Sequence, residues 1–289
     1  MAPSPVGRGA SKEVQAYSNN SRRSSLLGRS QMTVSSHPVP DEMNGQDSKF
    51  AIPQGPSLSP DGSAVYFSTF RPGVEGRRLV RIPLEGGEPE DLGWGADPAV
   101  SPGGDRLAYR ACTESGCGQE LVVLDLRTGE ETRVGSGDVD LQVGKTVWLP
   151  DGRLVVELLP PMDYSYGSPY RVIDPARAPP DLVDAPSLPN PPNTGEIGLY
   201  GYHAPTAGAI VGQFIQGEGP SPGGPVRYVS VDPDTGEVLA TVVRGGWWQV
   251  HPDASGRDLL LLDFRDRVYV SRDGSDPQPI AEGFSDLAW

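Results

Sequence analysis

Histidine and cysteine are scarce in this sequence. Among 289 residues there are three histidines, His37, His203 and His251, and two cysteines. Zinc sites that can be read from a sequence consist of closely spaced His and Cys ligands, and no His-Glu-x-x-His motif or Cys/His cluster occurs here. We therefore predict no metal site and no cofactor.

Long apolar runs are also missing. The longest aliphatic block is residues 259–262, far short of the ~18 residues that a membrane-spanning helix needs. The first residues lack the apolar core of about 7 to 15 residues that a secretory signal requires. No segment repeats its apolar residues with the 3.6-residue period of a helix. We therefore predict an all-β fold without a membrane span.

Basic residues are outnumbered, with 24 Lys and Arg against 38 Asp and Glu and a net charge of −14. Residues 1–48 carry +1, so residues 49–289 carry −15. This excess repels phosphate backbones, which argues against a nucleic-acid partner. Net acidity mainly serves solubility, but it also steers cationic partners toward a protein.

Residues 1–48 are rich in Ser, Arg, Asn and Pro and have no apolar periodicity. Such a composition cannot bury enough surface to fold, so we predict a disordered leader. It also resembles an organellar transit peptide, and a start assigned too far upstream of Met32 is a further alternative. The compartment stays open.

A short turn phrase recurs after the leader. Its copies are Ser59-Pro60-Asp61-Gly62, Ser101-Pro102-Gly103-Gly104, Leu149-Pro150-Asp151-Gly152 and His251-Pro252-Asp253. Apolar runs follow the first three copies, at residues 64–70, 106–111 and 154–158. The copies are 42, 48 and 102 residues apart, which matches the repeat of a β-propeller blade at about 40 to 45 residues with insertions.

We predict a β-propeller of four-stranded antiparallel blades over residues 49–289. The blades lie near residues 50–93, 94–136, 138–184, 197–244 and 245–283, and a terminal strand at 284–289 begins a sixth. The first blade ends in an outer strand near 88–92, and the next inner strand covers 98–101. Blade edges must be paired. Three arrangements satisfy this: the terminal strand closes a ring with N-terminal residues, the chain is part of a six-bladed protein, or five blades close.

The turn phrases, together with Asp125-Leu126-Arg127-Thr128-Gly129-Glu130 and Asp232-Pro233-Asp234-Thr235-Gly236-Glu237, resemble the TolB-like β-propellers, also called WD-like or PD40-type repeats. The resemblance covers residues 50–289. It implies a propeller that binds proteins or peptides and has no chemistry of its own. Similar repeats also precede an α/β-hydrolase in oligopeptidases, for which this chain has no room. Residues 1–48 do not resemble the N-terminal domain that accompanies the propeller in the periplasmic Tol-Pal component, so we do not expect that specific role.

Two motif matches have simpler explanations. Gly219-Pro220-Ser221-Pro222-Gly223 has the letters of a nucleophile elbow, but that serine must lie between a strand and a helix, and prolines flank it here. The segment 232–237 carries oxygen ligands that suit calcium. Asp and Gly at these positions also suit a hairpin turn, which we favour because residues 125–130 are a near copy.

The two cysteines, Cys112 and Cys117, flank Thr-Glu-Ser-Gly in a predicted hairpin loop. Residues that face each other across a hairpin can reach the Cα spacing of about 5.5 Å that a disulfide prefers. We predict a disulfide that clamps the loop, which favours an oxidising, extracytoplasmic compartment. The alternative is a pair of free cytosolic thiols, in agreement with the missing export signal.

Aligning the inner strands on the turn phrase places Gly55, Asp97, Lys145, Trp247 and Asp286 at one equivalent position, with Trp248 beside Trp247. Aromatic and charged groups of this kind are enriched at interface hot spots. We predict that Asp97, Lys145, Trp247, Trp248 and Asp286 bind a peptide or a short, preferably cationic, protein segment. In the competing interpretation the aspartates cap turns and the tryptophans pack between blades.

The sequence favours a non-catalytic binding scaffold or sensor domain that recognises a protein or peptide. One alternative is a propeller enzyme, such as a lyase or a glycan hydrolase, which needs two carboxylates a few ångströms apart. Among the aligned positions only Asp97 and Asp286 qualify. The other alternative is the propeller part of a larger peptidase-like protein. The partner and the oligomeric state stay open.

Overall fold

The computed structural model describes residues 52–70, 75–138, 140–159, 170–189, 199–206, 209–215, 226–252 and 258–283. Regular structure in these ranges is β-strand, apart from two 3-10 turns, η2 (Pro175–Arg177) and η3 (Leu182–Asp184). None of the described helices has the length and apolar character that a membrane crossing requires. The predicted leader and the predicted terminal strand at 284–289 lie outside the described residues.

The strands pair antiparallel with their neighbours in sequence order. One seven-stranded sheet contains β1 (Ile52–Leu58), β2 (Ala64–Phe70), β3 (Arg77–Pro83), β4 (Glu90–Val100), β5 (Arg106–Thr113), β6 (Gly116–Asp125) and β7 (Glu131–Gly135). A three-stranded sheet contains β8 (Gln142–Trp148), β9 (Leu154–Leu159) and β10 (Tyr170–Ile173). Two four-stranded sheets follow: β11 (Leu199–Thr206), β12 (Ala209–Ile215), β13 (Val226–Val231) and β14 (Val238–Arg244), then β15 (Gln249–Pro252), β16 (Leu259–Leu262), β17 (Arg267–Ser271) and β18 (Gln278–Glu282).

Strand β4 belongs to two units. Its first part pairs with β3 at Glu90 to Trp94, and its second part pairs with β5 at Gly95 to Val100. The prediction of separate strands near 88–92 and 98–101 is therefore wrong, because one extended segment runs from the outside of unit one to the inside of unit two. We call β1–β3 with the start of β4 unit one, the end of β4 with β5–β7 unit two, and the remaining three sheets units three to five.

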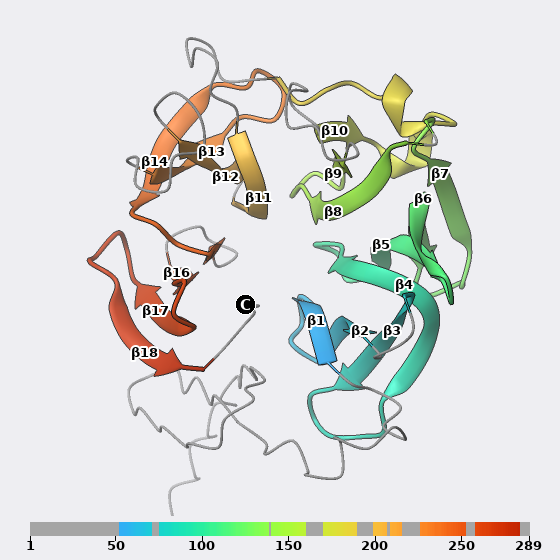
Figure 1. Ribbon diagram of the computed structural model, residues 1–289, viewed down its shortest axis with the longest axis horizontal. Coiled ribbons are helices and arrows are strands. Elements are labelled where there is room, and N and C mark those ends of the chain that lie inside the picture. The colour runs from blue at the N-terminus through green and yellow to red at the C-terminus, as the bar shows by residue number, and fades with distance from the viewer. Residues whose placement is uncertain are drawn as a thin grey trace, which may run out of the picture.

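The five units follow one another around a central axis, with β1, β8 and β11 toward the centre and β7, β14 and β18 at the outside (Figure 1). This arrangement confirms the prediction of an all-β propeller. Unit three has three strands, and an isolated antiparallel bridge between Arg171 and Ser187 lies where its fourth strand would be. The number of blades in the complete ring stays a prediction.

Apolar side chains on alternate positions fill the spaces between units. Leu107 and Tyr109 of β5 pack against unit one, whereas Ala108 between them packs against unit three. This follows from the two-residue period of a strand, which sends neighbouring side chains to opposite faces. The same rule joins units three and four through Val155 and Val229. Each of these sheets therefore needs its neighbours to cover both faces.

Polar contacts also cross the four boundaries between units that are consecutive in the sequence. The backbone N–H of Val100 donates to Ser57 Oγ at 3.0 Å, and the indole Nε1 of Trp148 donates to the carbonyl of Ala99 at 2.8 Å. Further along the ring, Arg153 pairs with Asp234 at 2.5 Å, and the Tyr228 hydroxyl donates to the carbonyl of Trp247. These contacts hold neighbouring inner strands and turns in a fixed relative position.

In units one and two, the serine that begins the recurring turn stabilises it. Ser59 Oγ accepts a hydrogen bond from the N–H of Ala64 at 2.9 Å and donates to Asp61 at 2.6 Å, which holds the pKa of that carboxyl at about 2. Ser101 Oγ accepts likewise from the N–H of Arg106 at 3.0 Å. The serine therefore joins the end of an inner strand to the start of the second strand and fixes their register.

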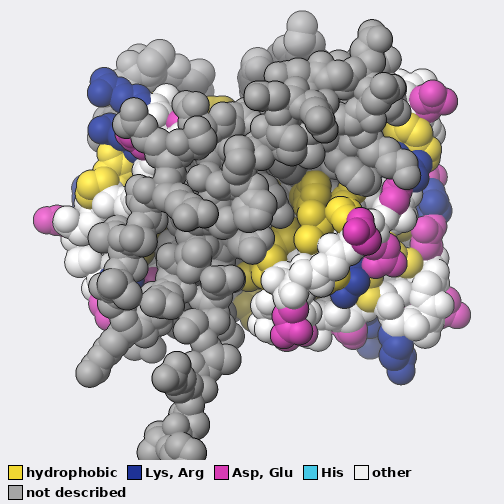
Figure 2. All heavy atoms as spheres, turned by 90° about the horizontal axis from the view of Figure 1, so that it is seen from below, with side chains coloured by type: hydrophobic (Ala, Val, Ile, Leu, Met, Phe, Trp, Pro, Cys, Tyr) yellow, Lys and Arg dark blue, Asp and Glu magenta, His cyan; other side chains and the backbone are white. Residues whose placement is uncertain are grey.

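The outer strand of unit two, β7, is polar. In β7, Glu131, Thr132 and Arg133 are exposed, and Arg133 forms ion pairs with Glu131 and with Glu120 of the neighbouring β6. Acidic side chains are spread over the described surface seen in Figure 2, with basic side chains between them. On the described part of this face, the acidic side chains therefore lie at several separate places.

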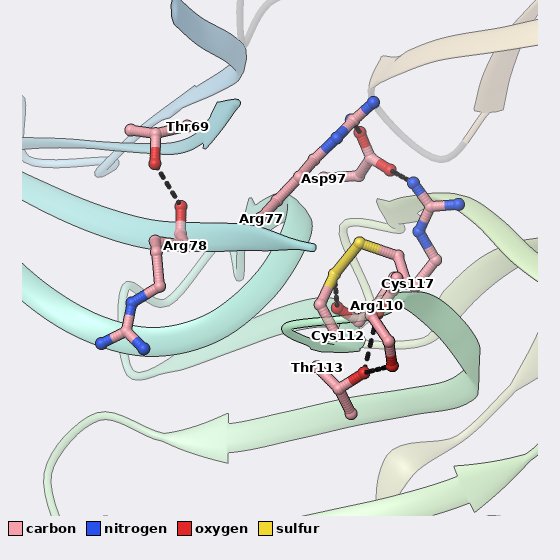
Figure 3. Close-up of a disulfide and its surroundings, with 10 residues drawn as sticks. Thr69, Arg77, Arg78, Asp97, Arg110, Cys112, Thr113 and Cys117 are labelled. Carbon is pink, nitrogen blue, oxygen red and sulfur yellow. Dashed lines mark hydrogen bonds and ion pairs between the residues drawn. A yellow bond between two sulfur atoms is a disulfide. The ribbon is translucent and has the colours of Figure 1, made fainter. Parts of the chain in front are cut away.

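Cys112 and Cys117 form a disulfide at the end of the β5–β6 hairpin (Figure 3). The S–S distance is 1.98 Å and the two residues are direct cross-strand partners. Their Cα atoms are 3.9 Å apart, closer than the spacing used in the sequence prediction. The predicted loop clamp is thus present.

Replacing both cysteines by serine (C112S with C117S) should lower the free energy of unfolding by roughly 2 kcal/mol, because the bond closes a short loop in the unfolded polypeptide. Denaturant unfolding of the wild type and the double variant measures this difference. In the native, unreduced wild type, an alkylating reagent should label neither residue. Labelling of both thiols would show that the bond is not formed.

The variant Trp148→Phe should lower the free energy of unfolding by about 1 kcal/mol, because the partly buried Ala99 carbonyl loses its donor between units two and three. Denaturant unfolding measures the change. Trp248→Phe is the matched control, since Trp248 is 57% exposed, and it should change stability by less than about 0.5 kcal/mol. Equal stability of the two variants would contradict the role of this hydrogen bond.

Candidate functional site

The inner strands of the first three units share an irregularity. The pairing register shifts between Gln54 and Ser57 in β1, between Ala96 and Ala99 in β4, and between Val143 and Thr146 in β8. The positions that the sequence aligned, Gly55, Asp97 and Lys145, lie inside these shifts. A bulge of this kind turns a side chain out of the regular ladder and is common near functional sites.

The structure brings the first two aligned positions together. Gly55 and Asp97 both have positive φ angles, of 59° and 54°. A Cβ atom added to Gly55 would lie 3.5 Å from Asp97 Oδ1. Asp97 thus has a backbone conformation that few residues with a side chain adopt, although aspartate tolerates it better than most.

Two arginines face the carboxylate of Asp97 (Figure 3). Arg110 Nη2 donates to Asp97 Oδ2 at 2.7 Å, and Arg77 Nη1 lies 3.9 Å from Asp97 Oδ1. Arg77 begins β3 in unit one, Arg110 lies in β5 of unit two, and Asp97 comes from the shared strand β4. The exposed fractions of the Arg77, Arg110 and Asp97 side chains are only 28%, 13% and 17%. Two guanidinium groups therefore face one carboxylate in a half-buried place.

The disulfide hairpin positions Arg77. The N–H of Gly76 donates to the carbonyl of Glu114 at 3.2 Å. A Cβ atom added to Gly76 would lie 1.7 Å from the carbonyl oxygen of Thr113, so this close approach requires glycine. Because Gly76 directly precedes Arg77, the hairpin of unit two determines where the first side chain of β3 begins.

Lys145 in unit three is exposed. The carboxylate of Glu157 lies against the backbone of its bulge. Glu157 Oε2 accepts from the N–H of Lys145 at 3.2 Å, and Glu157 Oε1 accepts from the Tyr170 hydroxyl at 3.3 Å. A Cβ atom on Gly144 would lie 2.5 Å from Glu157 Oε2. Glycine at 144 therefore makes room for the carboxylate.

Sequence reasoning missed Arg77, Arg110 and Glu157. Arg110 and Glu157 occupy equivalent positions, since Ala99 pairs with Ala108 and Val147 with Val155. Each is the first charged residue after an apolar run on its strand, Leu107-Ala108-Tyr109 or Leu154-Val155-Val156. A charged residue that interrupts an apolar strand was the sequence signal that could have identified Arg110 and Glu157.

The two adjacent tryptophans have different environments. Trp247 packs edge to face against Tyr269, with ring centroids 5.1 Å apart, and its Nε1 donates to the carbonyl of Arg244 at 3.1 Å. It thus belongs to the packing between units four and five. Trp248 is 57% exposed and packs edge to face on the ring of Phe264, itself 67% exposed, with ring centroids 5.7 Å apart.

Trp248 and Phe264 lie at the same end of the ring as Asp97. Gln249 pairs with Leu262 as Ala99 pairs with Ala108, so unit five repeats the register of unit two. Repeats around one axis place equivalent residues at the same height. Asp286 lies outside the described residues. We call this end the bulge end, defined by Gly55, Arg77, Asp97, Arg110, Lys145, Glu157, Trp247, Trp248 and Phe264.

The segment 232–237 is a hairpin turn. Asp232 Oδ1 accepts from the N–H groups of Asp234 at 2.8 Å and Thr235 at 2.9 Å, and these hydrogen bonds lower the pKa of Asp232. Asp125 makes the corresponding contacts in its near copy. The described residues contain no group of three or more His, Cys, Asp or Glu side chains placed to hold a metal ion.

No family model matches the chain, and no curated protein matches it in sequence. Solved structures do match. TolB from Acinetobacter baumannii is 14% identical with a TM-score of 0.55, over 81% of this chain and 55% of that protein. A TolB candidate from Agrobacterium tumefaciens is 19% identical with a TM-score of 0.55, over 81% and 82%. Acylaminoacyl peptidase from Pyrococcus horikoshii is 13% identical with a TM-score of 0.51, over 81% and 46%.

The chain thus spans about half the length of the Acinetobacter protein. At these identities the likeness concerns the fold alone. Together with the antiparallel units around one axis and the recurring turn phrase, it identifies the architecture: the protein has the fold of a TolB-like β-propeller.

Proposed function

We propose that the protein is a non-catalytic β-propeller that binds a protein or peptide partner at the bulge end. The observation that carries this proposal is the exposed pair of Trp248 and Phe264, 57% and 67% accessible. Large aromatic side chains left in water gain most when a partner covers them, and Trp is among the residues most enriched at binding hot spots.

The surroundings of this pair at the bulge end are charged. Lys145 is exposed, and Arg77 and Asp97 are partly accessible. An apolar anchor combined with polar groups of both signs is the usual anatomy of an interface, because the anchor provides affinity and the charges provide orientation. The bulges allow different side chains at the same position of successive units, because a residue in a bulge does not take part in the regular strand pairing.

The bulge end alone does not support a preference for cations. Asp97 would be the residue to attract a cation, but its carboxylate already faces the guanidinium groups of Arg77 and Arg110. A cationic partner stays a prediction that rests on the overall charge of −14, which acts over long range on the rate of encounter.

The enzyme alternative receives less support. It requires two carboxylates within a few ångströms of each other. Among the described residues Asp97 is paired with Arg110 and Arg77, and its proposed companion Asp286 is not described. The peptidase alternative rests only on similarity of fold.

Selection of a random peptide library displayed on phage against the full-length protein tests the proposal. We expect enriched peptides whose affinity falls about tenfold or more with Trp248→Ala, the size of effect typical of a hot-spot aromatic residue. Phe264→Ala should weaken the same peptides. Leu239→Ala is the matched control, because Leu239 is a comparably exposed apolar side chain, at 53%, on the outer strand β14.

Two results would contradict the proposal. One is that no peptide is enriched over an unrelated β-propeller of similar charge. The other is that enriched peptides lose affinity with Leu239→Ala and keep it with Trp248→Ala, which would place binding on the outer strands.

A further inference from the structure

Positive charge exceeds negative charge in the cluster of Arg77, Asp97 and Arg110. The two guanidinium groups carry one unit of positive charge each, and the single carboxylate cancels only one of them. The three side chains are between 13% and 28% exposed, so water screens them less than it screens surface groups. An unbalanced charge in such a place is unfavourable unless another group compensates it.

Donors in the cluster are also unused. The Nε atom of Arg110 is buried and has no hydrogen-bond partner among the residues that the structure describes. Arg77 approaches Asp97 only to 3.9 Å, which is too far for a hydrogen bond. Buried donors in proteins are normally paired, so an unpaired one calls for an explanation.

Arg78, the residue after Arg77 in β3, is an arginine whose hydrogen-bond donors are paired. Arg78 donates to Asp91 from Nε at 3.1 Å and from Nη2 at 2.7 Å, and its guanidinium lies 4.8 Å from the centre of the Trp94 ring. Figure 3 shows Arg77 directed toward Asp97 and Arg78 directed away from it. Arg77 and Arg110 are therefore both directed toward Asp97, whereas Arg78 is not.

We propose that Arg77 and Arg110 form a binding site for a single carboxylate group of the partner, either an Asp or Glu side chain or a free terminal carboxylate. This deepens the proposed function and rests on it. Asp97 acts as the positioning residue that separates the two guanidinium groups and holds Arg110. Arginine suits this task because its planar donors match the two oxygens of a carboxylate.

The charge balance favours a carboxylate over a phosphate group. One monoanion makes the cluster neutral, whereas a dianion would leave it negative within a protein whose net charge is already −14. The site thus accepts one negative charge at short range, although the overall field of the protein attracts cations at long range.

The test uses the full-length protein with 15N-labelled arginine and follows the Nε–Hε signals in NMR spectra at constant ionic strength. The probes are N-acetylglycylglycine, which has a free terminal carboxylate, and the α-amide of N-acetylglutamate, which has a side-chain carboxylate. The more strongly bound probe identifies the source of the group. We expect saturable shifts of the Arg77 and Arg110 signals with at least one probe, and weaker binding of inorganic phosphate.

Three variants sharpen the test. Arg77→Gln should weaken binding of the probe about tenfold or more, through loss of charge-assisted hydrogen bonds. Arg78→Gln removes the same charge from the neighbouring position and should leave binding unchanged. Asp97→Asn removes the competing internal carboxylate and should tighten binding about threefold or more. This last effect is opposite to that of a damaged fold.

The inference is overturned if neither probe gives a saturable shift, if sodium chloride at the same concentration gives equal shifts, or if Arg78→Gln weakens binding as much as Arg77→Gln. These outcomes are separable from failure of the proposed function. Enriched phage peptides that depend on Trp248 but contain no carboxylate would support the scaffold while contradicting this site.

Discussion

Leu107 and Tyr109 pack against one neighbouring unit, and Ala108, which lies between them in the sequence, packs against the other. This two-sided burial is the constraint on which the structure depends, because no unit can cover both faces of its own sheet. Contacts such as Trp148 to Ala99 and Val100 to Ser57 then fix how far neighbouring units rotate against each other. The apolar faces drive association, and the polar contacts select one arrangement.

The candidate binding residues Asp97, Lys145 and Trp248 lie at positions that do not pack between units. At the inner edge of the first three units, a bulge releases a residue from the alternating pattern, so that position can vary without loss of packing. Asp97 and Lys145 carry opposite charges at equivalent positions, and Gly55 carries no side chain there. One scaffold can thereby present different groups around a common end, which suits recognition of an irregular partner more than it suits repetition of one chemical step.

Much of the fold could be predicted from the sequence, since the turn phrase and the apolar alternation are local signals. Strand β2 occupies the predicted residues 64–70. The candidate site could be predicted less well from the sequence. Arg77 lies near Asp97 next to the point where Gly76 meets the disulfide hairpin of the next unit, and no local sequence pattern encodes that approach. Trp247 and Trp248 are identical in type and both precede β15, yet Trp247 packs against Tyr269 whereas Trp248 is exposed beside Phe264, so the residue type alone does not distinguish their environments.

Hydrogen–deuterium exchange of the full-length protein, measured with and without a bound peptide, tests the central claim most directly. If the bulge end is the binding surface, the peptide should slow exchange of backbone amides at residues 95–98, 110–113, 143–146 and 247–249. The outer strands β7, β14 and β18 should be unaffected. Slower exchange confined to those outer strands, with no change at the bulges, would contradict the account.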